Sequence, residues 1–170
     1  MESGRDRSPC YRPVVCRLRA QRKQRQIDKS METASVTRRY RFAASHRLHA
    51  THLSEEENWK VFGKCNNPNG HGHNYALLVT VQGTIDPQTG RVTDLETLDR
   101  IVTETVVARF DHRDLNHDPE FANRVTTGEN LVRLIWDLLA KRIPTGQLEK
   151  VGLVETRDNY FEYSGDYVRN

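Results

Sequence analysis

The chain has 170 residues, of which 36% are hydrophobic and 29% charged; this size and composition favour one small soluble domain and leave little room for two. The net charge of +3 is uneven, because residues 1–30 carry +6 and the rest of the chain sums to −3. No apolar run approaches the roughly 20 residues that span a bilayer, so we expect no membrane anchor. The cysteines Cys10, Cys16 and Cys65 form no disulfide framework, which favours a reducing compartment and predicts a cytoplasmic protein.

The amino-terminal segment, residues 1–33, differs in composition from the rest. It is rich in arginine, has few apolar residues and shows no sustained period, so we predict a disordered basic extension followed by a folded domain over residues 34–170. A basic arm can bind phosphate polyanions, which makes a non-enzymatic nucleic-acid binder one alternative function. The acidic balance of the folded part and its lack of a nucleic-acid-binding motif argue against that alternative.

The first half of the folded part is predicted to form two strands joined by a long loop. Alternating apolar residues predict a strand over residues 39–48, and residues 49–70 are polar with glycine and proline, which is typical of a loop. A loop of this length in a small domain is usually functional. Period-two alternation then predicts a strand over residues 71–85, and turn residues at 86–90 end it.

Two amphipathic helices are expected next. Asp94 can cap a helix whose apolar stripe runs through residues 95–110. Thr126 and Glu129 have capping-box spacing, which predicts the start of a second helix that a proline at position 144 ends.

Two final strands are expected over residues 148–156 and 159–168. The element order is therefore β-β-α-α-β-β. This order predicts an α+β fold, with a four-stranded antiparallel sheet and both helices on one of its faces.

Three histidines are candidate metal ligands. His71 and His73 are two residues apart on the second strand, so both point to one face, and His46 lies near the end of the preceding strand. Antiparallel pairing of the strands would bring the three imidazoles together. Three neutral imidazoles with an open fourth position are the pattern of a catalytic zinc site. Spacing alone leaves open that these histidines lie on a solvated face. It also leaves three rival ligands: His49, His52 and His117.

Several segments give the sequence a specific family resemblance. Residues 42–48 read FAASHRL and residues 62–75 read FGKCNNPNGHGHNY. Three shorter segments follow in chain order: FDHRDLN at 110–116, TTGEN at 126–130 and VET at 154–156. Together they resemble the 6-pyruvoyl-tetrahydropterin synthase family over about residues 39–165. One departure is Gly128, where the family often has a hydroxyl residue.

The resemblance implies the tunnelling fold, in which the sheets of several subunits close into a barrel, usually in a homohexamer of two stacked trimers. It implies one zinc ion per subunit, bound by His46, His71 and His73. The implied reaction removes triphosphate, accompanied by Mg²⁺, from 7,8-dihydroneopterin triphosphate to give 6-pyruvoyl-tetrahydropterin, a step of tetrahydrobiopterin synthesis. That reaction consumes no external redox cofactor, and the chain has neither a G-x-G-x-x-G motif nor a P-loop.

The resemblance also implies the catalytic groups. Cys65, as a thiolate, would take a proton from the carbon next to a side-chain hydroxyl, while zinc acts as a Lewis acid. Asp111 and His112 would relay protons to and from a Cys65 thiol, which in family assemblies can belong to a neighbouring subunit. Without the resemblance, Cys65 would be interpreted as a small loop residue and the Asp–His pair as the end of a helix.

Two residues are assigned to the substrate by the same resemblance. The carboxylate of Glu155 would accept two parallel N–H donors of the pterin ring, and Thr127 would also contact the pterin. An exposed strand glutamate is the alternative for Glu155. Glu129 is the rival carboxylate, although capping-box spacing already explains its presence. Three cations are candidates for the triphosphate, and the sequence does not choose among them: Arg47, Lys64 and Arg113.

A second enzyme of the same fold, the 6-carboxy-tetrahydropterin synthase of queuosine synthesis, is the main alternative. That branch typically places its cysteine closer to the His-Gly-His segment. Here five residues separate Cys65 from His71, which favours the pyruvoyl-forming enzyme.

Overall fold

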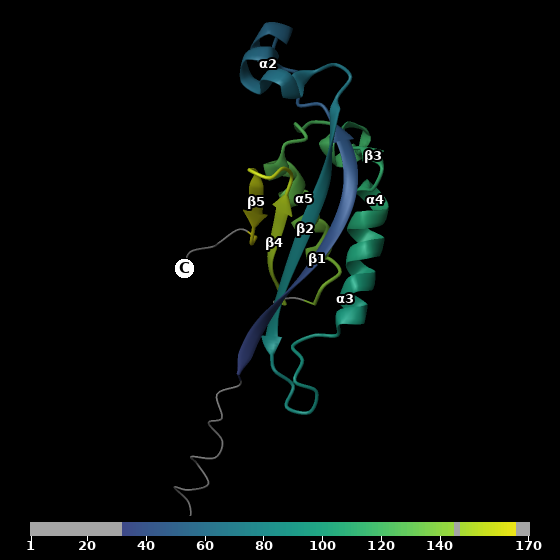
Figure 1. The fold of residues 1–170 in the computed structure, drawn as a ribbon, viewed down its shortest axis with the longest axis vertical. Helices are drawn as coiled ribbons and strands as arrows, with labels where there is room; N and C mark the ends of the chain where they lie inside the picture. The colour runs from purple at the N-terminus through teal and green to yellow at the C-terminus, as the bar shows by residue number, and fades with distance from the viewer. Residues whose placement is uncertain (1–31, 145–146, 166–170) are drawn as a thin grey trace, which may run out of the picture. The chain divides into compact units, whose positions relative to one another are not determined.

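The computed structural model describes residues 32–144 and 147–165. The predicted basic extension therefore lies outside the described residues, except for its last two positions, and Thr33 already belongs to the first strand. One sheet with the strand order β3-β1-β2-β4-β5 forms the centre of the folded part (Figure 1). Within the described ranges, no helix is both long and apolar enough to cross a bilayer.

The two long strands pair along their whole length. β1 (Thr33–His46) and β2 (His71–Thr84) are antiparallel, with Thr33 opposite Thr84 and His46 opposite His71. β1 begins earlier than the sequence pattern predicts. The pattern missed this start because the first residues of the strand are exposed and show no apolar alternation. It ends at His46, two residues before the predicted boundary.

The predicted four-stranded antiparallel sheet is confirmed, and a short fifth strand extends it. β4 (Leu148–Val154) pairs antiparallel with β2, and β5 (Tyr160–Tyr163) pairs antiparallel with β4. β3 (Arg113–Asp114) adds two residues in parallel to the other edge of β1. A two-residue strand has no periodicity, so sequence reasoning could not find it.

The helices cover one face of the sheet (Figure 1). α3 (Leu95–Val102) begins after its cap Asp94 and continues through a π-helical turn (Thr103–Val107) into α4 (Ala108–Phe110). α5 (Gly128–Ala140) is the second predicted helix. Their apolar stripes and the inward residues of the strands form one core, whose fully buried members include Leu77, Val79, Val102, Ile135 and Leu153.

The long polar loop contains a helix that the sequence analysis missed. α2 (Glu55–Phe62) is followed by a 3₁₀ turn (Gly63–Asn66), and the pair lies beyond the end of the sheet in Figure 1. Ser54 and Glu57 form a capping box at its start, and this spacing is visible in the sequence. The helix lacks an apolar stripe, because Asn58 is its one buried residue, and so the period-3.6 signal is absent.

The predicted cap of α5 is wrong by one residue. Thr127 is the N-cap, and its hydroxyl accepts a hydrogen bond from the Asn130 N–H at 3.4 Å. Thr126 is fully buried and donates its hydroxyl to the Arg47 carbonyl at 3.1 Å. Glu129 is exposed and takes no part in a capping box, so the helix cap does not account for its presence.

The departure at Gly128 has a packing explanation. The ring of Phe161, from β5, lies against the first turn of α5, and a Cβ on residue 128 would lie 2.1 Å from Phe161 Cε2. No side chain fits at that distance. Glycine at position 128 therefore leaves the space that the Phe161 ring occupies.

We predict that Gly128→Thr lowers the free energy of unfolding by about 1–3 kcal/mol, the usual cost of overpacking. Phe161→Val in the same chain makes room and should recover most of this loss. Urea unfolding of the two single variants and the double variant measures the coupling. Strictly additive single losses would contradict the packing explanation.

Candidate functional site

The register of β1 and β2 brings the three predicted ligands together. His46 lies opposite His71, and His73 lies opposite the buried Ala44, so the three imidazoles share the inward face at this end of the hairpin. One ligand nitrogen from each histidine lies within 4.8 Å of the others, and His46 is only 2% exposed. Among the described residues, this is the one group of three or more His, Cys, Asp or Glu side chains that could hold a metal ion. The rival ligands His49, His52 and His117 are not part of this group.

A hydrogen bond fixes the tautomer of His46 that can bind a metal. Its Nδ1 lies 2.7 Å from the Thr126 carbonyl, which can only accept, so Nδ1 carries the proton and Nε2 keeps its lone pair. That Nε2 is 3.1 Å from Nε2 of His71. Two nitrogens at 2.0–2.1 Å from a tetrahedral zinc ion are roughly 3.4 Å apart, so the residues fit such an ion.

Burial favours the neutral form of two of the imidazoles. It lowers the pKa of His46 and of His71, and the proximity of His73 lowers the pKa of His71 further. A neutral imidazole offers the lone pair that a metal needs. The low-dielectric surroundings therefore favour metal ligation over protonation.

Glu155 lies beside this cluster. Its Oε1 is 3.9 Å from His46 Nε2 and accepts the Tyr75 hydroxyl at 3.3 Å. Tyr75 is 1% exposed and stacks on Phe42 with ring centroids 4.9 Å apart, and burial raises its pKa well above the usual range. The phenol therefore stays a neutral donor that holds the carboxylate next to the imidazoles.

The predicted relay pair is formed at the end of α4. Asp111 accepts the Ala43 N–H at 2.8 Å and His112 Nδ1 at 2.9 Å, and these bonds lower the pKa of the Asp111 carboxyl. His112 has a φ of +56° and donates its own N–H to the Ala43 carbonyl at 2.6 Å. Its side chain is 83% exposed. The carboxylate thus fixes the tautomer, and the free Nε2 faces outward.

Cys65 lies in the loop between β1 and β2, outside the histidine cluster. It is half-buried in the 3₁₀ turn after α2, where its carbonyl accepts the Leu48 N–H at 2.9 Å. Across the described residues, no hydrogen bond joins its thiol to the three imidazoles, to Asp111 or to His112. One chain therefore brings the histidines and Glu155 together, whereas no hydrogen bond among the described residues joins the thiol to its predicted relay.

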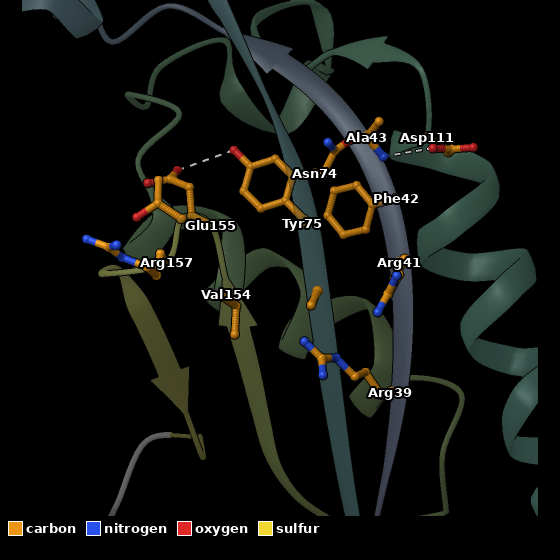
Figure 2. A pocket seen from close by; sticks show the side chains of 12 residues that line it. Arg39, Arg41, Phe42, Ala43, Asn74, Tyr75, Asp111, Val154, Glu155 and Arg157 are labelled. Atoms are coloured by element: carbon orange, nitrogen blue, oxygen red, sulfur yellow. Dashed lines mark hydrogen bonds between the residues drawn. The ribbon is translucent and has the colours of Figure 1, made fainter.

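A cavity of about 670 Å³ lies across β1, β2 and the end of β4. Figure 2 shows Glu155 on one side of it and Asp111 on the other, with Tyr75 and Phe42 between them. Thr127 does not line this cavity; it caps α5.

Sequence reasoning missed the residues that orient the site. The Thr126 carbonyl fixes the His46 tautomer, and the Tyr75 hydroxyl holds Glu155. Asn116 brackets Arg47, since its side chain accepts the Arg47 N–H at 2.6 Å and donates to the Arg47 carbonyl at 2.9 Å. Only Tyr75 had a signal, because it continues the alternation of the two ligand histidines.

Comparisons with known proteins agree on one family. The family model described as 6-pyruvoyl tetrahydropterin synthase matches residues 35–166. The 6-pyruvoyl tetrahydrobiopterin synthase of Homo sapiens is 52% identical over 134 residues, which cover 78% of this chain and 92% of that protein. That of Drosophila melanogaster is 44% identical, with coverage of 81% and 83%.

Solved structures agree as well. The structure of Caenorhabditis elegans 6-pyruvoyl tetrahydropterin synthase has a TM-score of 0.76 and 39% identity, and covers 79% of this chain and 97% of that one. The architecture and the histidine cluster thus define an α+β protein of the tunnelling fold with a candidate metal centre at one end of its sheet. The chain belongs to the 6-pyruvoyl tetrahydropterin synthase family.

We predict that replacing His71 and His73 together by alanine reduces bound metal from about one ion per chain to nearly none, because one imidazole cannot hold the ion. Elemental analysis after dialysis measures the content. His117→Ala is the matched control, since that side chain is 87% exposed and outside the cluster. Full metal content in the double variant would overturn the ligand assignment.

Proposed function

We propose that this chain is a zinc-dependent lyase that removes triphosphate from 7,8-dihydroneopterin triphosphate to give 6-pyruvoyl-tetrahydropterin, a step of tetrahydrobiopterin synthesis. The observation that carries this proposal is the cluster of three imidazoles in a chain that belongs to this family. The relatives of Homo sapiens and Drosophila melanogaster are 6-pyruvoyl tetrahydrobiopterin synthases, which supports the pyruvoyl product over the 6-carboxy product. Analysis of the product formed from the triphosphate substrate tests the choice directly.

The proposed metal is zinc, held by His46, His71 and His73. When bound, zinc would supply Lewis-acid stabilisation for negative charge that develops on the substrate side chain. The chain's own residues then do the remaining work. Cys65 as thiolate takes the proton from carbon, and the Asp111–His112 pair carries protons to and from that thiol. Asp111 supports this role, because it holds His112 Nδ1 as a donor and leaves Nε2 free.

We also propose that two chains complete one site, in a cytoplasmic homohexamer of two trimers. The support is that Cys65 makes no hydrogen bond to the relay among the described residues, while the His112 side chain is 83% exposed. An exposed imidazole oriented by a carboxylate can reach a thiol of a neighbouring subunit. Mg²⁺ would accompany the substrate triphosphate.

Glu155 is proposed to bind the substrate, with Thr127 as a second contact. The pterin ring has its N–H edge and its side chain on opposite sides, whereas Glu155 Oε1 lies only 3.9 Å from His46 Nε2. That short distance also suits contact with the reacting side chain. In that case the exposed Glu129, beside Thr127 and unused by the helix cap, would take the ring.

Two variants separate these roles. Glu155→Gln and Glu129→Gln each remove one charge-assisted acceptor, worth about 1.5–3 kcal/mol. We expect the variant that loses the ring acceptor to weaken binding of unphosphorylated 7,8-dihydroneopterin roughly tenfold or more. A carboxylate that serves the reacting side chain should instead lower kcat with little change in that affinity. Wild-type behaviour of Glu155→Gln in both measurements would remove Glu155 from the site.

Cys65→Ala tests the base. We predict that this variant keeps its zinc and its substrate affinity, because sulfur is not a proposed ligand, while the single-turnover rate falls about 10²–10⁴-fold. Lost metal would instead make Cys65 a ligand. A near-normal rate would show that Cys65 is only a loop residue.

A further inference from the structure

We propose that Asn66 and Arg47 position Cys65, so that its thiol is held at a fixed place relative to the three candidate ligand histidines of the same chain. The inference rests on the proposed function, in which Cys65 is the base. It names two residues that act through Cys65 and not on the substrate. A base has to lie within short reach of the proton that it removes, so a base on a long loop needs groups that hold the loop.

The turn that carries Cys65 is not held by an apolar core. α2 and the 3₁₀ turn after it have two buried residues, and both are asparagines: Asn58 and Asn66. Two apolar side chains of α2, Trp59 and Val61, are instead 58% and 62% exposed. The position of Cys65 therefore depends on hydrogen bonds more than on apolar packing.

Asn66 uses both N–H groups of its side-chain amide to hold the turn. It is 3% exposed, and its Nδ2 donates to the Leu48 carbonyl at 2.7 Å and to His49 Nδ1 at 3.1 Å. The carbonyl of Cys65 itself accepts the Leu48 N–H at 2.9 Å. The turn is thus bonded to the segment that directly follows the candidate ligand His46.

Arg47 binds the same asparagine with two donors. Its Nε donates to the Asn66 backbone carbonyl at 2.9 Å, and its Nη2 donates to the Asn66 side-chain oxygen at 3.1 Å. The other partner of the guanidinium, Glu55, is 3.3 Å away and its side chain is 77% exposed, so that ion pair contributes little. A planar guanidinium can donate to two acceptors at once, whereas the ammonium of a lysine is a compact point charge.

The backbone of Arg47 is bonded to the part of the fold that orients His46. The Arg47 N–H donates to the Asn116 side-chain oxygen at 2.6 Å, and the Arg47 carbonyl accepts the Thr126 hydroxyl at 3.1 Å. The carbonyl of the same Thr126 accepts His46 Nδ1 at 2.7 Å. A continuous set of hydrogen bonds therefore runs from a candidate metal ligand to the turn that carries the thiol.

The single-turnover rate of the zinc-loaded, full-length protein tests the inference. We expect Asn66→Ala to lower this rate about 10–100-fold, because a small misplacement of a reacting group is costly. Zinc content and the affinity for unphosphorylated 7,8-dihydroneopterin should stay unchanged. Asn58→Ala is the matched control, because Asn58 is fully buried on α2 and its amide donates to the carbonyls of residues 50, 53 and 54. It should lower the melting temperature but keep the wild-type rate.

The Cys65→Ala background separates positioning from a general structural role. A residue that acts through the thiol has nothing to position in that background, so adding Asn66→Ala should cause no further loss of rate. Arg47→Lys keeps the positive charge but cannot span both acceptors, and it should show the same pattern. This second variant decides the matter where Asn66→Ala does not fold.

The possible failures can be told apart. A wild-type rate in both Asn66→Ala and Arg47→Lys would overturn the inference alone. So would a further loss of equal size when either change is added to Cys65→Ala, or a loss of zinc that accompanies the loss of rate. A near-normal rate in Cys65→Ala itself would instead overturn the base role in the proposed function.

Discussion

The pairing register of β1 and β2 is the constraint on which the site depends. Antiparallel pairing places His46 opposite His71 and positions His73 two residues further along the same face. A slip of one residue would turn one strand's side chains to the other face and separate the imidazoles. The register is held by the buried apolar residues of both strands, including Phe42 stacked on Tyr75. The hydrophobic core therefore fixes the relative positions of the three imidazoles.

The same sheet organises the chemistry around that centre. Tyr75 follows the candidate ligands His71 and His73 on the inward face of β2 and holds Glu155 beside them. The backbone of Ala43 on β1 holds Asp111 and His112 at the edge of the sheet. Of the candidate ligands, His46 is buried and His71 and His73 are half-buried, whereas the side chain of His112 is 83% exposed. The proposed assembly of several chains would bring this exposed imidazole to a neighbouring subunit.

Much of this arrangement could be predicted from periodicity. Alternation on β2 placed His71, His73 and Tyr75 on one face, and the apolar stripes of α3 and α5 located the helices. Other features gave weak signals or none. α2 has no apolar stripe, β3 has two residues, and the cap of α5 is Thr127 because the buried Thr126 bonds elsewhere. The orientation of His46 by a backbone carbonyl from α5's entry loop depends on tertiary contact, which local sequence cannot encode.

We propose that three imidazoles hold a zinc ion that this chain needs to release triphosphate. Adding zinc back to metal-free protein, while triphosphate release from 7,8-dihydroneopterin triphosphate is followed, tests the claim most directly. We predict a rate that rises in proportion to zinc and levels off at one ion per chain, with 6-pyruvoyl-tetrahydropterin as the product. Full activity of the metal-free protein, or a rate that does not respond to zinc, would contradict it.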